Sequence, residues 1–234
     1  MGTMLSFVIP AHNEEALVAE TVRAIRSAAV AYPHEIIVVD DGSTDRTPAA
    51  ASAEGARVVP VKVRHIAAAR NAGAAAATGE TLVFVDADTL VTREVVDGVV
   101  QAVGAGAIGG GSLVKLDRPV GRSIRAWVAT FAWLSRTFRI AGGCFLFSSR
   151  EGFNTIGGFD ETYFVAEDIA FCRALRRYGR VVIVEHAVTT SARKLTTHSA
   201  GEILWTLLYV AVRPGAIKRR AALGFWYGPR RKDG

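Results

Sequence analysis

Cysteine and long hydrophobic runs are both scarce in this sequence. Cys144 and Cys172 are the only cysteines among 234 residues, and neither shows CxxC spacing or a histidine at metal-ligand spacing. We therefore expect no cysteine metal site and predict that both thiols lie in the core. The apolar run from Ile203 to Val212 has about half the length that a bilayer-spanning helix needs, so we predict that it does not span a membrane.

A secretion leader, internal repeats and a nucleic-acid module are also lacking. The first predicted strand, Leu5–Ile9, follows Met1 closely without a basic and then apolar leader, so we expect no export and a cytoplasmic location. The net charge of +6 favours anionic partners, but several of the basic residues crowd into the C-terminal tail. No basic stripe with interleaved aromatics runs through the chain, so we predict phosphates or a membrane face as the partner, and no nucleic acid.

What the sequence does contain is a regular alternation of strand-like and helical patterns. Half of its residues are hydrophobic, which is enough for the core of a single domain. The predicted strands are 5–9, 35–39, 57–63 and 81–85, and the predicted helices are 14–31, 47–54 and 67–78. Four buried strands alternating with helices predict an α/β domain with a doubly wound, mostly parallel sheet.

The second half of the chain is less regular. The glycine-rich stretch Gly104–Gly111 is predicted to be flexible, and Lys115 is predicted to end a strand. The later predicted elements are a helix over 122–139, a strand over 142–147, a turn over 157–161, a helix over 168–178, a strand over 181–184 and a final helix over 200–212. We predict one domain over residues 1–195 and a C-terminal helix with a basic tail over 196–234.

Polar residues follow three of the predicted strands, at the point where each strand ends. Residues 10–15 follow the first strand, 40–45 the second and 86–88 the fourth. Because ligands of such sheets bind at the carboxyl ends of the strands, we expect these loops to form one site. Asp86 and Asp88 are suited to a hard cation, Mg²⁺ or Mn²⁺, that neutralises a diphosphate. The alternative is that they only cap the next helix.

Several motifs occur together in an order and spacing typical of one family. They are Pro10-Ala11-His12-Asn13-Glu14, Asp40-Asp41-Gly42-Ser43-Thr44-Asp45, Arg70-Asn71-Ala72-Gly73, Gly79-Glu80 and Phe84-Val85-Asp86-Ala87-Asp88. Over about residues 5–190, the sequence resembles the inverting family 2 glycosyltransferases. The resemblance implies a GT-A fold with a Rossmann-like sheet, a nucleotide-sugar donor that is most often a UDP-sugar, and Mn²⁺ or Mg²⁺. It also implies a nucleotide-binding half of about 1–110 and an acceptor-binding half of about 111–195.

The resemblance further implies roles for single residues. Asp41 is expected to accept the N3 hydrogen of a uracil-like base, and Arg70 is expected near the base or the phosphates. The donor-binding residues that it implies are Pro10, Ala11, Asn13, Glu14, Asp41, Arg70, Asp86, Ala87 and Asp88, with Asp88 as a metal ligand. The alternatives are a solvated turn for Asp41 and loop or helix-surface positions for Asn13 and Arg70.

An acidic pair, Glu167-Asp168, follows the turn at 157–161 by the interval seen in the family. There the pair opens a helix and its Asp is the general base, so the resemblance makes Glu167 and Asp168 the catalytic residues. The alternative is that both acids only favour a positive helix N-terminus. His186 is expected just after its strand, as a metal ligand or as a surface residue. Arg193 and Lys194 are expected to fold over the diphosphate or to lie in a solvated loop.

The tail, the acceptor and the reaction class each leave alternatives. The aromatic and basic residues of the tail are typical of an interfacial segment, which would make the protein peripheral at the inner face of a membrane. The alternative is packing on the domain or on a homodimer partner. The acceptor is lipid-linked or a small polar molecule. A metal-dependent nucleotidyltransferase and a non-catalytic nucleotide-sugar-binding scaffold are the competing functions, although the sequence lacks a phosphate loop rich in Gly and Lys or Arg after its first strand.

Overall fold

The computed structural model describes residues 3–138, 141 and 143–193, and these residues form a mixed α/β fold. The elements in chain order are β1 (Leu5–Ala11), α1 (Val18–Ala28), β2 (His34–Asp41), α2 (Thr47–Ala53), β3 (Arg57–Val61), α3 (Ile66–Ala76), β4 (Thr81–Val85), β5 (Thr89–Leu90), α4 (Arg93–Gly104), β6 (Ala107–Leu116), α5 (Arg122–Phe138), β7 (Phe145–Ser149), α6 (Arg150–Ile156), α7 (Glu167–Leu175) and β8 (Arg180–Thr190). The predicted C-terminal helix and basic tail lie outside the described residues. Within the described ranges, every helix is too short or too polar to cross a bilayer.

The described strands form one eight-stranded sheet with the order β3-β2-β1-β4-β7-β6-β8-β5. β1 to β4 pair in parallel, as do β6 and β8. β7 runs antiparallel to both β4 and β6, and β5 runs antiparallel to β8. The predicted parallel sheet is therefore confirmed for the first four long strands, and β7 joins them to the strands of the second half.

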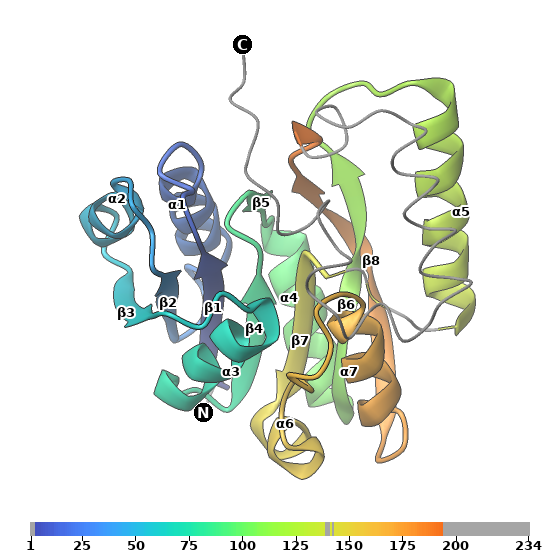
Figure 1. Ribbon diagram of the computed structural model, residues 1–234. Helices are drawn as coiled ribbons and strands as arrows, with labels where there is room; N and C mark the ends of the chain where they lie inside the picture. The colour runs from blue at the N-terminus through green and yellow to red at the C-terminus, as the bar shows by residue number, and fades with distance from the viewer. Residues whose placement is uncertain (1–2, 139–140, 142, 194–234) are drawn as a thin grey trace.

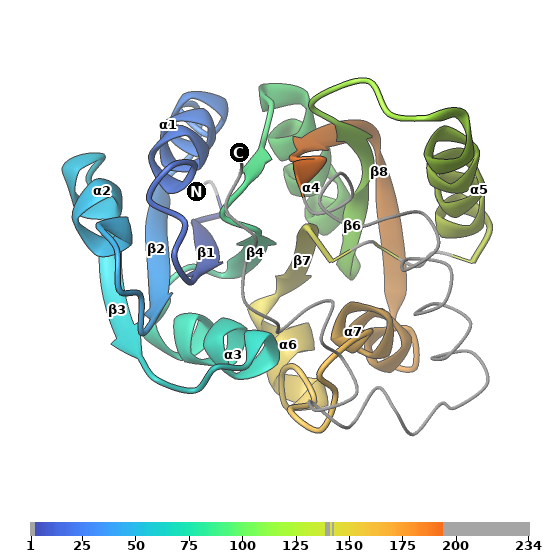
Figure 2. The same ribbon diagram turned by 45° about the horizontal axis from the view of Figure 1, so that its top comes forward.

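Helices cover both faces of the sheet, as Figures 1 and 2 show. On one face, α1, α2 and α4 pack with Phe7, Ile9 and Val85 in one hydrophobic cluster. On the other face, α3, α6 and α7 pack with Val8 and Phe84 in a second cluster. Both faces are apolar because side chains alternate along a strand, and each face is covered by helices. The core thus lies on both sides of β1 and β4, the strands that carry the predicted site loops.

The second half differs from its prediction in several elements. Helices α4 and α6 were not predicted, and most of the stretch expected to be flexible belongs to β6, which begins at Ala107. Glycine is needed there for close approach: a Cβ added to Gly111 would lie 2.2 Å from the Cβ of Ala141 and 2.7 Å from the carbonyl oxygen of Phe145. Glycine in a strand often marks such a contact, so the composition indicates packing rather than flexibility.

Two later predictions concern the ends of elements. The helix predicted over 122–139 is confirmed as α5, which stands at the edge of the molecule in Figure 1. The last described strand, β8, ends at Thr190, six residues beyond the predicted end at Val184. β8 is longer because it pairs with β6 over nearly its whole length, with a register shift between Val184 and Ala187.

Candidate active site

The loops that follow β1, β2 and β4 meet at one edge of the sheet, which we call the carboxyl edge (residues 12–17, 42–46 and 86–88). The side-chain oxygen of Asn13 accepts a hydrogen bond from the backbone N–H of Thr44 at 2.8 Å, and the N–H of Asn13 donates to Ser43 Oγ at 2.9 Å. Asn13 has a φ of 53°, a left-handed conformation that Asn tolerates. The predicted meeting of the first two loops is confirmed, and Asn13 joins them.

Asp41 ends β2 and is only 7% exposed. One carboxylate oxygen accepts hydrogen bonds from the N–H groups of Val63 and Arg64, at 2.8 and 2.9 Å, and the other accepts one from His65 at 3.1 Å. The alternative of a solvated turn is therefore wrong for Asp41. Its carboxylate holds the loop between β3 and α3 against the carboxyl edge.

The last two residues of β1 differ in exposure. Ala11 is 3% exposed and belongs to the hydrophobic cluster beneath α1, so its side chain lies in the core. Pro10 is partly exposed and points to the opposite face, because side chains alternate along the strand. Of this pair, only the Pro10 side chain is available at the surface of the site.

Arg70 lies in α3 and is 1% exposed, so the alternative of a helix-surface position is wrong for Arg70. Its Nη1 donates to Glu167 Oε1 at 2.9 Å, and its Nη2 donates to Asp86 Oδ1 at 3.0 Å and to the carbonyl oxygen of Gly143 at 2.7 Å. Burial opposes the charged form, but the carboxylates of Asp86, Glu167 and Asp168 hold the pKa of Arg70 above its usual value. Arg70 is therefore a buried cation shared by acids from distant parts of the chain.

Asp86, Ala87 and Asp88 form a turn after β4, closed by a hydrogen bond from Thr89 N–H to the Asp86 carbonyl at 3.1 Å. Asp86 is partly exposed and pairs with Arg70. Ala87 is 4% exposed, and its carbonyl accepts the hydroxyl of Thr21 at 2.8 Å. The partly exposed Asp88 instead accepts a hydrogen bond from Thr190 Oγ1 at 3.4 Å. The two carboxylates thus contact different sides of the carboxyl edge.

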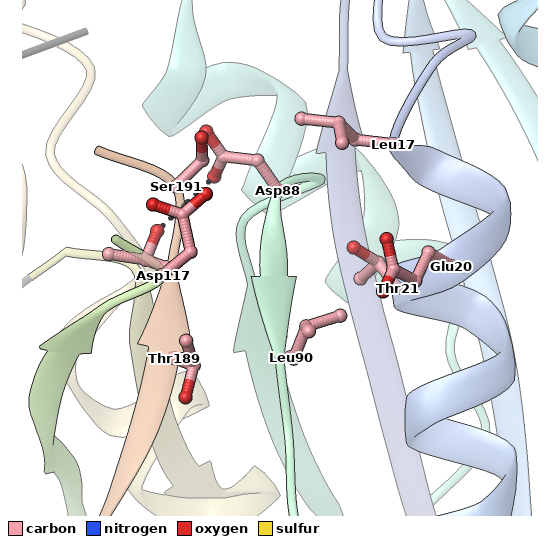
Figure 3. A pocket seen from close by; sticks show the side chains of 9 residues that line it. Leu17, Glu20, Thr21, Asp88, Leu90, Asp117, Thr189 and Ser191 are labelled. Atoms are coloured by element: carbon pink, nitrogen blue, oxygen red, sulfur yellow. Dashed lines mark hydrogen bonds between the residues drawn. The ribbon is translucent and has the colours of Figure 1, made fainter. Parts of the chain in front are cut away.

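Asp88 lines an open pocket of about 130 Å³ between α1, the loop after β4 and the ends of β6 and β8 (Figure 3). Its lining residues are Leu17, Glu20, Thr21, Asp88, Leu90, Asp117, Thr189, Thr190 and Ser191. Asp117, which the sequence analysis missed, accepts the N–H of Ala192 at 2.9 Å. Across the part of the chain that the structure describes, no three or more His, Cys, Asp or Glu side chains converge to hold a metal ion. The acids of this pocket line it without meeting at one point.

Glu167 and Asp168 open α7, as predicted. Asp168 is partly buried, and the N–H of Ile169 donates to its Oδ1 at 2.8 Å. Burial and the charge of Glu167 raise the pKa of Asp168 to about 7, although the Ile169 N–H and Arg70 act in the opposite direction. A carboxyl group with a pKa near neutral pH is suited to take up and release a proton.

Arg193, the last described residue of the chain, contacts the loop after β1. Arg193 Nη2 donates to Glu14 Oε2 at 2.7 Å, and the Glu14 side chain is 6% exposed. The backbone N–H of Glu14 donates to Thr47 Oγ1 at 2.8 Å. Glu14 is thus buried at the carboxyl edge and held by Thr47 and Arg193, while Lys194 lies outside the described residues.

His186 lies within β8, so its predicted place after the strand is wrong. His186 is exposed and lies in the register shift of β8. The pKa of the exposed Glu94, at the start of α4, is lowered mainly by a hydrogen bond from Thr92 and to a smaller extent by His186. His186 lies four positions before Thr190, which contacts Asp88. At about 3.3 Å per residue, this is roughly 13 Å of strand. The structure does not bring His186 to the aspartates after β4.

The family of this chain is identified by its similarity to known proteins. The model of the family described as glycosyl transferase family 2 matches residues 6–178, well over half of the chain. The chain therefore belongs to glycosyl transferase family 2. This finding argues against the nucleotidyltransferase, which the sequence left as an alternative.

Two curated relatives illustrate the range of similarity. The succinoglycan biosynthesis protein ExoO of Rhizobium meliloti is 29% identical over 235 residues, which cover 92% of this chain and 62% of that protein. The glucosyl-3-phosphoglycerate synthase of Mycolicibacterium smegmatis is 36% identical over 97 residues, which cover 38% of this chain and 32% of that protein. The chain thus spans less than two thirds of the length of either relative.

Solved structures share the fold. The mannosyltransferase of Pyrobaculum calidifontis, solved with GDP-mannose and Mn²⁺, is 22% identical with a TM-score of 0.67 and covers 97% of this chain and 70% of that one. The glucosyl-3-phosphoglycerate synthase of Mycobacterium tuberculosis, solved with Mn²⁺, UDP and phosphoglyceric acid, is 22% identical with a TM-score of 0.62 and covers 98% and 80%. The predicted GT-A fold is confirmed.

Proposed function

We propose that this glycosyltransferase moves a sugar from a UDP-sugar to an acceptor hydroxyl, with inversion at the anomeric carbon. The observation that carries the proposal is the bridge from Arg70 to Asp86 and to Glu167, the neighbour of Asp168. Asp86 follows a strand of the half formed by residues 1–110, whereas Asp168 opens a helix of the half formed by residues 111–195. The donor binds the first half, the acceptor binds the second, and the reaction occurs where Arg70 joins them.

In this proposal Asp168 is the general base. The acceptor oxygen attacks the anomeric carbon on the face opposite the diphosphate, and the bond from that carbon to the diphosphate oxygen breaks. The hydroxyl proton passes to Asp168, and UDP leaves with the electron pair of the broken bond. The pKa of Asp168, raised to about 7, is close to the optimum for such a base near neutral pH.

The donor set after β4 fits a divalent cation, Mn²⁺ or Mg²⁺. Asp86 and Asp88 are both partly exposed and carry carboxylate oxygens, which hard cations prefer. Asp88 would hold the cation with help from Asp86, and we assign no ligand role to His186. When bound, the cation offsets the charge of the diphosphate as it leaves. The Mn²⁺ in the solved mannosyltransferase and in the mycobacterial synthase supports this assignment.

Uracil is the base that we assign to the donor, with Asp41 as its acceptor. Each carboxylate oxygen can accept more than one hydrogen bond, so the contacts of Asp41 with the loop before α3 leave capacity for an imide N–H. The partly exposed Pro10, with Asn13 and Glu14, shapes the nucleoside site. UDP in the mycobacterial synthase supports uracil, and GDP-mannose in the mannosyltransferase makes guanine the competing base.

Two classes of acceptor remain under this proposal. The relative named for succinoglycan biosynthesis favours a saccharide, which in this proposal is lipid-linked, and the synthase solved with phosphoglyceric acid favours a small polar molecule. A lipid-linked acceptor would require the protein to contact the inner face of a membrane, for which the basic tail is our candidate element.

Release of UDP from a panel of UDP-sugars, with Mn²⁺ and with both acceptor classes, tests the proposal. Lipid-linked saccharides are supplied in vesicles and small hydroxyl compounds in solution. We expect one donor and acceptor pair to release UDP well above hydrolysis, and the product to carry the inverted anomeric configuration. A retained configuration, or activity with GDP-sugars or ADP-sugars alone, would contradict it.

A further inference from the structure

Arg70 is the largest fully buried side chain among the described residues. A buried charge is costly unless it is paired. The two terminal nitrogens of Arg70 donate hydrogen bonds to Glu167, Asp86 and the Gly143 carbonyl. Its Nε, in contrast, is buried without a hydrogen-bond partner within the described residues. The orientation of the guanidinium thus pairs its terminal nitrogens with the acids and leaves one N–H group without a hydrogen bond.

The three contacts of Arg70 come from distant parts of the chain. Asp86 lies 16 residues away after β4, Gly143 lies 73 residues away before β7, and Glu167 lies 97 residues away at the start of α7. The guanidinium carbon also lies 5.3 Å from the ring centre of Phe159, which limits its movement. One rigid, forked cation therefore sets the distance between the turn after β4 and the first turn of α7.

Gly143 connects this cation to Asp168 as well. A Cβ added to Gly143 would lie 3.0 Å from Asp168 Oδ2, so the backbone at Gly143 passes close to the carboxylate of the base. Because Arg70 bonds the carbonyl of Gly143, it fixes the segment that passes beside Asp168. Arg70 thus acts on Asp168 through two neighbours, Glu167 and Gly143.

We propose that Arg70 is a positioning residue that holds the donor-side Asp86 and the base Asp168 at a fixed separation. This inference rests on the proposed function of Asp86 and Asp168. Because the Arg70 side chain is only 1% exposed, we assign it this indirect role rather than a direct contact with the phosphates of a donor. Arg70 acts through the carboxylates that contact the cation and the acceptor.

Arg70→Lys tests the geometry while it keeps the charge. Lysine offers one nitrogen and lacks the planar fork, so it cannot hold Glu167, Asp86 and Gly143 together. We expect kcat to fall at least about tenfold, whereas the Kd for UDP with Mn²⁺ changes about threefold or less, because small displacements of reacting groups affect turnover most. UDP release and calorimetry measure the two quantities on the folded protein.

Arg70→Gln tests the charge. Arg70 lowers the pKa of Asp168, so loss of the Arg70 charge should raise the pKa of Asp168 by about one unit or more. The pH at which kcat/KM reaches half its maximum should therefore move upward. In Arg70→Lys this pH should stay close to that of the wild type. If Arg70→Gln does not fold, the split between kcat and Kd in Arg70→Lys still decides the question.

Arg150→Lys is the matched control. Arg150 also donates to three groups, the carbonyl oxygens of Gly79, Ala74 and Ala77, at the opposite end of the sheet. We expect this variant to lose stability but to keep kcat, Kd and the pH profile. The same result for Arg70→Lys would overturn the inference, since Arg70 would then only support the fold.

The wild-type protein separates this inference from the proposed function. A wild type that neither binds UDP with Mn²⁺ nor releases UDP from any UDP-sugar would overturn the proposed function and this inference with it. An active wild type whose Arg70 variants keep their kcat and pH profile would overturn this inference alone.

Discussion

Asp168 lies at the start of α7 with one carboxylate oxygen bonded to the N–H of Ile169 and with Glu167 beside it. Asp168→Asn keeps the shape of the side chain but cannot take up the acceptor proton. We predict that turnover falls about a hundredfold or more, the usual scale for a positioned base, while donor binding stays nearly unchanged. Asp160→Asn, in the exposed turn before α7, is the control and should keep its turnover. Near-native transfer by Asp168→Asn would leave Asp168 as a helix-start acid only.

The pH dependence of the reaction follows from the same residue. Burial and the charge of Glu167 raise the pKa of Asp168 to about 7, and the base acts in its unprotonated form. We therefore predict that kcat/KM rises with pH and reaches half its maximum near pH 7. Glu167→Gln removes a neighbouring negative charge, so the pKa of Asp168 should fall and the rise should move to lower pH. A rise that stays in place, or moves upward, would contradict the assigned cause.

At the scale of single elements, the close packing of β6 requires its glycines. A Cβ on Gly111 would lie 2.2 Å from the Cβ of Ala141, so we predict that Gly111→Ala lowers the free energy of unfolding by about 1–3 kcal/mol. Gly104 ends α4 with open space around its Cα, so Gly104→Ala should be neutral or stabilising by up to about 1 kcal/mol. Urea denaturation measures both variants. Equal effects at the two positions would argue against close packing of β6.

The elements differ in how far the sequence predicts them. β1, β2 and β4 were predicted because apolar runs that end in polar turns are a local signal. α4 could also have been predicted, because its buried residues Val95, Val96, Val99 and Ala102 have helical spacing. For β6 only the end was predicted, at Lys115. Its glycine-rich first half could not be predicted as a strand, since these glycines are explained by Ala141 and Phe145, which lie some thirty residues farther along the chain.

At the scale of the whole molecule, the sequence predicts where the acids of the site lie but not what they contact. Asp86 and Asp168 were predicted from motifs at the ends of a strand and at the start of a helix. The partners of Arg70 could not be predicted, because Glu167 lies 97 residues away, and the pair of Arg193 with Glu14 spans 179 residues. These contacts depend on the order of strands in the sheet, in which β7 separates β4 from β6.

Binding of UDP measured by titration calorimetry tests the central claim, a cation-assisted UDP-sugar site at the carboxyl edge, most directly. With Mn²⁺ we predict an affinity about tenfold or more above that in excess chelator, equivalent to about 1.4 kcal/mol. Asp88→Asn should lose this gain, whereas Asp117→Asn, in the same pocket, should keep it. The account also predicts tighter binding of UDP than of GDP or ADP. Equal affinity for UDP with Mn²⁺ and with chelator would contradict the role of the cation, and a preference for GDP would contradict the role of Asp41.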